Sequence, residues 1–169
     1  MKNKLMIIVL AISSAGFTMP SAFTEFFTSG YWVGEAKYYK NNEVDSQFFY
    51  AAEISADGKT FNTLTPPNAD PEARFQRYAL GDGGLSYSLR FTPDRTMQGI
   101  LNEYEEQHDA WTFYSGRIRH TYKKLSDTKI LIETYFGDKK HAEIVLSYQG
   151  SGMLGFMWVG LAQVQYRPQ

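Results

Sequence analysis

A chain of 169 residues with a formal net charge of −1 is long enough for one domain with a sizeable core, and it lacks the basic surface that nucleic-acid binding requires. It contains no cysteine, which excludes disulfide bonds, thiolate metal sites and a lipid-modified N-terminal cysteine. Aromatic residues make up 16% of the chain, with twelve Tyr and twelve Phe, and such wide rings pack well on the faces of β-strands.

Residues 1–22 are typical of a secretory signal peptide. Two lysines precede a short apolar stretch, residues 5–12, which cannot cross a bilayer as a stable helix because that needs about 20 residues. We expect cleavage after Ala22, with cleavage after Ala15 as the alternative, and a buried N-terminal helix is the competing interpretation. The signal is of bacterial type, so we expect residues 23–169 to form a single domain in the periplasm or the medium.

From residue 31 onward, strand-like runs alternate with short clusters of turn residues. The expected runs are residues 31–39, 46–55, 60–64, 74–80, 85–92, 100–108, 110–115, 117–125, 128–136, 141–149 and 156–167. Their spacing of mostly about 8–12 residues is typical of an all-β barrel or sandwich, and the short links favour antiparallel, up-and-down connection. Because some neighbouring runs can join, we expect a single antiparallel up-and-down barrel of about 8–10 strands.

Two segments depart from this pattern. Residues 65–73 contain three prolines and are expected to form a long loop over or beside one mouth of the barrel. Residues 156–167 are apolar and follow a glycine-rich stretch; we expect them to be the closing strand, with an apolar patch that docks a partner as the alternative.

Strict alternation along the runs places an unusual number of polar side chains on the inner faces, together with Ile100. The inward polar residues are Tyr50, Tyr87, Asn102, Tyr104, His120, Tyr122 and Tyr148. A buried hydroxyl or imidazole without a partner costs about 1–3 kcal/mol. These groups therefore either satisfy one another in a filled core or line a cavity and orient a ligand. The candidate ligand-binding residues are Tyr50, Tyr87, Asn102, Tyr104, His120 and Tyr122.

The first strand begins with the sequence GYWVGE, residues 30–35. This resembles the Gly-x-Trp start of the calycin superfamily, which includes lipocalins, fatty-acid-binding proteins and nitrobindin-like barrels, and looks closest to secreted bacterial members without an assigned function. The resemblance implies that Trp32 closes one end of the barrel, with Arg167 as the arginine that packs on it. The Gly-rich runs of nitrobindin-like proteins are missing, so neither haem nor another cofactor is expected. Gly34 fits a strand position where the backbone of a neighbour approaches closely.

No catalytic or metal-binding signature is present. The chain has three histidines, and none forms the i, i+2 pair that a metal site on a strand favours. The leading hypothesis is a soluble exported protein that binds a small, mostly apolar or aromatic ligand inside the barrel. The alternatives are an isomerase- or cyclase-type enzyme with His120 as base and a tyrosine as acid, and a ligandless module for envelope interactions. Charged outward positions such as Arg117 and Arg119 argue against a barrel embedded in lipid, and the oligomeric state stays open.

Overall fold

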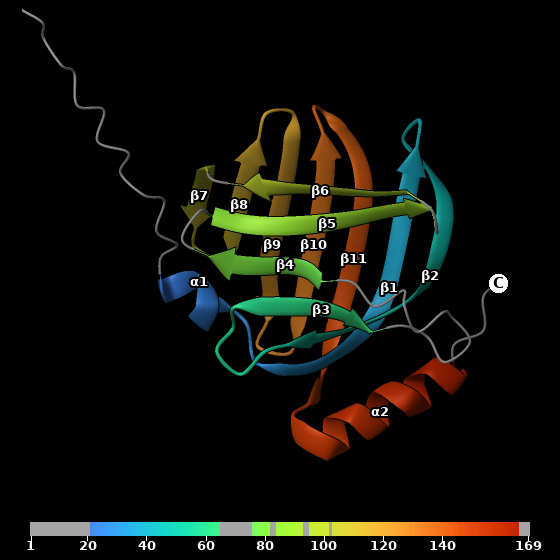
Figure 1. Cartoon of the computed structure of the whole chain (residues 1–169). Coiled ribbons are helices and arrows are strands. Elements are labelled where there is room, and N and C mark those ends of the chain that lie inside the picture. Colours follow the sequence, from blue (N-terminus) through green and yellow to red (C-terminus); the bar gives the residue numbers. More distant parts are fainter. Residues whose placement is uncertain (1–20, 65–75, 82–83, 93–94, 102, 166–169) are drawn as a thin grey trace, which may run out of the picture.

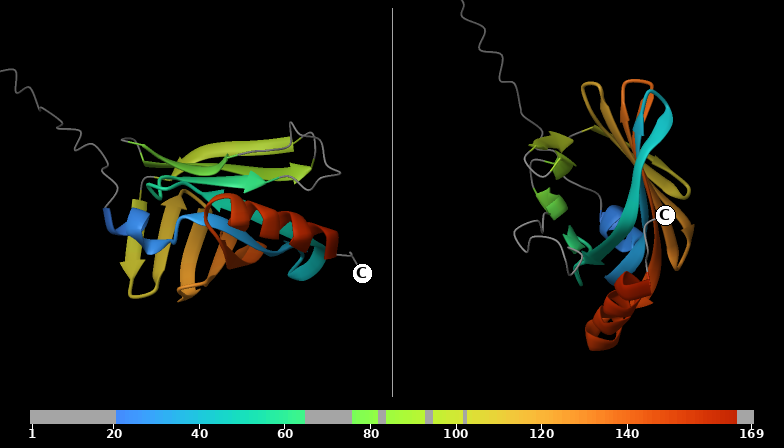
Figure 2. Two further views of the ribbon diagram at one scale, coloured as in Figure 1. Left: turned by 90° about the horizontal axis from the view of Figure 1, so that it is seen from below. Right: turned by 90° about the vertical axis from the view of Figure 1, so that its right-hand side faces the viewer.

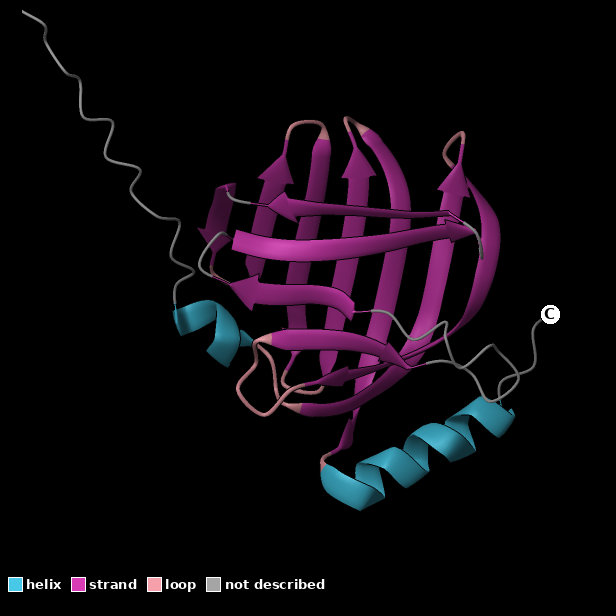
Figure 3. Cartoon of the chain, viewed as in Figure 1, coloured by secondary structure: helices cyan, strands magenta, loops and turns pink. Residues whose placement is uncertain are grey.

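The computed structural model describes residues 21–64, 76–81, 84–92, 95–101 and 103–165. This part of the chain contains eleven strands, which form one sheet in the order β6-β5-β4-β3-β2-β1-β11-β10-β9-β8-β7. The strands are β1 (Gly30–Lys40), β2 (Glu43–Ile54), β3 (Thr60–Leu64), β4 (Gln76–Gly81), β5 (Gly84–Thr92), β6 (Arg95–Leu101), β7 (Glu103–Gln107), β8 (Ala110–Ser115), β9 (Ile118–Ser126), β10 (Lys129–Phe136) and β11 (Lys139–Gly150). Helix α1 (Ser21–Phe26) precedes the sheet and helix α2 (Gly152–Gln165) follows it (Figures 1 and 3).

The sheet curls into a nearly closed antiparallel barrel (Figure 2). Strands that follow one another in sequence pair with each other, apart from β6 and β7, and β1 also pairs with β11. The two edge strands of the sheet are therefore β6 and β7, and β6 lies against β8 where the edges approach each other. This confirms the all-β, up-and-down fold and is consistent with a calycin-like barrel. The sheet has eleven strands because the run expected at residues 100–108 is divided between β6 and β7, and β6 begins at Arg95.

Close approach of β1 and β11 requires a glycine at position 34. A Cβ atom added to Gly34 would overlap the carbonyl oxygen of Val145, which is backbone and cannot move aside. Gly34 pairs with Leu146 on β11 and with Tyr50 on β2, so the close contact lies in the middle of the sheet. The expectation that Gly34 marks a close backbone approach is confirmed.

The C-terminal run is a helix, so the prediction of a closing strand at residues 156–167 is wrong. The last strand of the sheet is β11, which pairs with β1. Gly150 and Gly152 have φ angles of +110° and +63°, conformations that glycine adopts readily and that end the strand there. The following residues lack strict alternation and include Met, Leu, Ala and Gln, which are favourable in helices.

The prediction that Ile100 faces inward is also wrong. Leu101 pairs with Leu85, and both side chains are fully buried, whereas Ile100 pairs with Ser86 and is 55% exposed. Strict alternation does not continue from β6 to β7: the side chains that face inward in β6 are not the ones that a pattern set by β7 predicts. The expected loop at residues 65–73, Asn102 and Arg167 lie outside the described residues.

The end of the barrel below β1 is closed by the segment that joins α1 to β1. The indole N–H of Trp32 donates a hydrogen bond to the carbonyl oxygen of Thr28 (3.0 Å), and the hydroxyl of Tyr148 donates to the carbonyl oxygen of Ser29 (3.2 Å). The two rings are 5.2 Å apart, and the side chain of Trp32 is only 1% exposed. Trp32 therefore lies where the Gly-x-Trp resemblance expects it. This end, formed by residues 27–32 and Tyr148, is called the closed end below.

Ion pairs on the outer wall connect β9, β10 and β11. The carboxylate of Glu133, which is buried, contacts the ammonium groups of Lys123 (2.8 Å) and Lys140 (2.6 Å) and accepts a hydrogen bond from the hydroxyl of Tyr135 (3.1 Å). Lys140 also pairs with Glu143 (2.7 Å). Burial raises the pKa of Glu133, but the hydrogen bonds and charges of the two lysines outweigh it and lower that pKa from 4.5 to about 2.

We expect Glu133→Gln to flatten the acid dependence of stability. A carboxyl with a depressed folded-state pKa stabilises the fold above its unfolded pKa, and this contribution is lost as the pH falls from about 4.5 to about 2. The loss should amount to about 1–3 kcal/mol in the parent protein and be absent from the variant. Urea denaturation between pH 2 and pH 7 measures it, with Glu103→Gln on the exposed strand β7 as the control. Equal pH slopes for parent and Glu133→Gln would contradict the assignment.

Candidate ligand site at the hairpin end of the barrel

The end of the barrel opposite the closed end carries three tight hairpin turns, at Asn41-Asn42, Gly116-Arg117 and Gly137-Asp138 (Figure 1). It is called the hairpin end below. Asn41 and Asn42 both have positive φ, as the mirror-image hairpin turns require, and asparagine tolerates that conformation. The amide N–H of Gly137 donates to the carbonyl oxygen of Arg117 at 2.6 Å, which ties two of the turns together.

A polar group lies inside the barrel one layer below this end. His120 on β9 shares a hydrogen bond of 3.0 Å between its Nδ1 atom and the hydroxyl of Thr134 on the neighbouring strand β10. The ring of Tyr87, from β5 on the other side of the barrel, lies 4.9 Å from the imidazole. A Cβ atom on Gly99 would meet the hydroxyl of Tyr87 at 2.6 Å, so this glycine gives the tyrosine ring its place. The three side chains are buried and fix one another's positions.

Above this group, at the hairpin end itself, four rings form an aromatic layer. Tyr38 stacks on Phe48 with ring centroids 5.3 Å apart, and the imidazole of His141 lies 5.7 Å from Tyr38 and 4.9 Å from Phe136. Tyr38, Phe136 and His141 are half-buried, and Phe48 is exposed, so the layer reaches from the interior to the surface. The rings of this layer and the polar group below it together form the candidate site.

Sequence alternation did not predict the position of His141. Thr134 pairs with Ala142, but Tyr135 pairs with Lys140, so His141 is the extra residue of a β-bulge. A bulge changes the direction of the side chains near it. By alternation His141 faces away from its inward neighbour Ala142, yet its ring packs between Tyr38 and Phe136. Lys139-Lys140 before the histidine gives no sequence signal for a bulge at this point.

The other sequence-predicted site residues lie elsewhere. The hydroxyl of Tyr50 shares a short hydrogen bond of 2.6 Å with that of Thr63, inside the wall formed by β2 and β3. Tyr104 packs against Trp111, with ring centroids 5.4 Å apart, but it lies on the edge strand β7 and is 40% exposed. Asn102 is outside the described residues.

Tyr122 belongs to an aromatic cluster deeper in the barrel. Its ring contacts those of Tyr78, Phe113 and Phe23 at centroid distances of 5.6, 6.0 and 5.8 Å. Phe23 comes from α1, so this helix contributes a fully buried ring to the cluster. The candidate site therefore unites Tyr87 and His120 of the predicted set, and Tyr122 lies below them.

The tyrosine hydroxyls near the site stay protonated and neutral. Burial raises the pKa of the Tyr87 hydroxyl, and burial followed by the neighbouring Tyr122 raises the pKa of Tyr78 well above 10. Both hydroxyls thus keep their protons at neutral pH. Within the described residues, no group of three or more His, Asp or Glu side chains is placed to hold a metal ion. Neutral donors beside apolar rings favour binding and orientation of a molecule over ionic chemistry.

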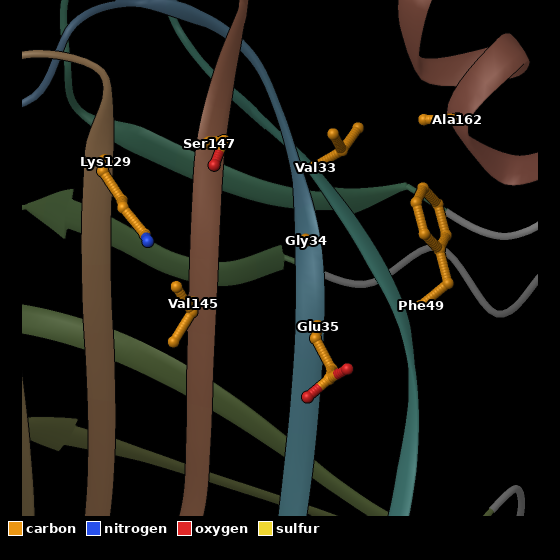
Figure 4. A pocket seen from close by; sticks show the side chains of 8 residues that line it. All are labelled: Val33, Gly34, Glu35, Phe49, Lys129, Val145, Ser147 and Ala162. Atoms are coloured by element: carbon orange, nitrogen blue, oxygen red, sulfur yellow. The ribbon is translucent and has the colours of Figure 1, made fainter. Parts of the chain in front are cut away.

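A concave feature lies outside the barrel, between its wall and α2. It has a volume of about 560 Å³ and is lined by side chains of β1, β2, β10 and β11 together with one residue of α2 (Figure 4). The lining residues are Val33, Gly34, Glu35, Phe49, Lys129, Val145, Ser147 and Ala162. This outer-wall groove is mostly apolar, with one carboxylate and one ammonium group.

No protein-family model, curated protein or solved structure matches this chain. Its function therefore has to be inferred from the geometry of these two features. Neither of the two helices in the described residues is long and apolar enough to span a membrane.

Proposed function

We propose that this protein binds a small, mostly apolar molecule at the hairpin end of the barrel. The observation that carries the proposal is the buried polar group formed by Tyr87, His120 and Thr134 inside a core against which the half-buried rings of Tyr38 and Phe136 pack. Small-molecule sites typically combine apolar walls with a few fixed polar groups. Aromatic rings at the entrance suit a planar or ring-containing ligand, whose polar atom would point down toward Tyr87 and His120.

Retention of a ligand is the direct test. Native mass spectrometry of the protein purified from its source should show a species heavier than the bare chain, and mild denaturation should release the added mass. A fluorescent probe, anilinonaphthalene sulfonate, should then bind the emptied barrel and be displaced by the released molecule. A bare chain that also fails to bind the probe would contradict the proposal.

Two threonine variants show whether the candidate site holds the ligand. Thr134→Val keeps the side-chain shape but removes the hydrogen bond to His120, and we expect it to weaken probe or ligand binding by about 3- to 10-fold, since such a bond contributes about 0.5–1.5 kcal/mol. Thr63→Val removes the equivalent bond to Tyr50 in the wall and should leave the affinity unchanged. Titration calorimetry or fluorescence measures both. Equal loss of affinity in the two variants would show that the ligand does not bind next to His120.

A further inference from the structure

Helix α2 exposes an unusual amount of apolar surface. Six large apolar side chains of this helix are each 50–73% exposed, although the ring of Phe156 also lies against that of Tyr31 on β1, with centroids 5.9 Å apart. They are Met153, Leu154, Phe156, Met157, Trp158 and Leu161. On the opposite side of the helix, Val159 and Ala162 pack on the outer wall, and Gly155 lies close to Gly150 and Tyr31.

The exposed apolar face is wider than a simple amphipathic stripe. At about 100° per residue, the six positions span an arc of about 200° around the helix axis. An amphipathic surface helix usually has an apolar stripe of about 100° that faces its own core, and a helix that is apolar all round is normally buried. The exposed side of α2 therefore has the composition of a buried helix surface. A partner with a flat surface would bury only part of this wide apolar arc.

The outer-wall groove beside α2 offers a mostly apolar, open surface for a second helix of this kind. It is lined by Val145 of the barrel wall, by Phe49 of β2 and, where α2 meets the wall, by Val33 and Ala162 (Figure 4). A helix in the groove would contact α2 on one side and the wall on the other. The apolar side chains of that helix would thus be buried on two sides, over the wide arc that the exposed face of α2 occupies.

Charge and area both favour a second copy of the chain as the occupant. No residue from Gly152 to Gln165 is charged, so two copies of α2 meet without repulsion. The carboxylate in the groove, Glu35, already pairs with Lys37 (3.2 Å). The six side chains present on the order of 700 Å² of surface, given that aromatic side chains of this size bury about 150–250 Å² each. A stable interface needs about 800 Å² per partner, and the groove residues supply the remainder.

We infer that α2 is a dimerisation helix, which inserts its exposed face into the outer-wall groove of a second copy while the groove of the first copy receives the partner helix. The contact is isologous, as in most symmetric dimers. It lies on the outer wall of the barrel, away from the polar group around His120, so it leaves the candidate ligand site accessible.

Sedimentation equilibrium of the full chain tests this inference. Between about 1 and 100 μM the parent protein should sediment as a dimer, because interfaces of this size have dissociation constants of micromolar or tighter. Trp158→Glu, which places a charge on the exposed face of α2, and Val145→Lys, which places one on the groove floor, should each weaken the dimer at least 100-fold. Val44→Glu is the matched control, since Val44 is also 50% exposed but lies beside the β1–β2 hairpin.

Circular dichroism and thermal melting should show that the variants remain folded, because Trp158 and Val44 are largely exposed. A dimer that persists in Trp158→Glu, or a parent protein that stays monomeric at 100 μM, would overturn the inference. Flotation of the monomer with phosphatidylcholine–phosphatidylglycerol vesicles, lost in Trp158→Glu, would assign the helix to a lipid surface instead.

Discussion

Replacing Trp32 with alanine should lower the free energy of unfolding by about 3–5 kcal/mol, the cost of removing a large buried aromatic side chain. The indole is almost completely buried at the closed end, packs on Tyr148 and donates a hydrogen bond to the carbonyl oxygen of Thr28. Its loss leaves a cavity and an unpaired carbonyl group, and it frees the segment that joins α1 to β1. A domain of this kind has only about 5–15 kcal/mol of stability in total, so the variant should melt far below the parent.

Trp158→Ala is the matched control for this experiment. It removes the same side chain from a site that is 55% exposed, and in monomeric protein the stability should change by no more than about 0.5 kcal/mol. Urea denaturation of the two variants at concentrations below the dimer dissociation constant separates the effects. A Trp32→Ala protein that unfolds like the parent but no longer binds ligand would place the binding site at the closed end.

The parts of the fold that the sequence predicts well are those in which one face of a strand is buried. The inward residues of β10 and β11, such as Ile132, Ile144 and Leu146, are all buried as their alternation indicates. The neighbouring hairpins are equally clear because glycine or asparagine with positive φ marks their turns. A period of two, with short turns between runs, is enough to determine an antiparallel up-and-down barrel.

The errors arise where local periodicity carries little information. At the edges of the sheet, β6 and β7 follow each other with a change of phase, so Ile100 is exposed and Leu101 is buried. The sequence of α2 has no charged residue and only two polar side chains, Gln163 and Gln165, so neither a strand pattern nor an amphipathic helix pattern can be recognised in it. The glycines at positions 150 and 152 end β11 there, and the helix then packs so closely that a Cβ atom on Gly155 would overlap the carbonyl oxygen of Gly150.

The candidate site could be predicted only in part, for the same reason. Tyr87 and His120 are inward residues of regular strands, so their meeting across the barrel follows from alternation. The pairing of Tyr50 with Thr63 depends on the register of β2 and β3, which sequence spacing does not define. The aromatic layer depends on the bulge at His141, which appears only when the pairing of β10 and β11 is known.

Phe23→Ala should have an effect as large as that of Trp32→Ala, for a different reason. Phe23 is fully buried, and its ring lies 5.0–5.8 Å from those of five other residues, so that α1 plugs the aromatic cluster in the barrel. The five are Phe27, Tyr78, Trp111, Phe113 and Tyr122. We expect a loss of about 3–5 kcal/mol, whereas Phe26→Ala, at a half-buried position of the same helix, should cost less than half as much.

The space left by Phe23 also provides a test of where the proposed ligand lies. A cavity lined by aromatic rings can bind a small apolar molecule such as benzene, which should raise the melting temperature of Phe23→Ala but not that of the parent. Because the cavity lies below the polar group of Tyr87, His120 and Thr134, ligand binding at the hairpin end should continue in a folded Phe23→Ala protein. If benzene instead displaces the natural ligand from this variant, the ligand extends down past His120 into the aromatic cluster, and α1 is part of its binding site.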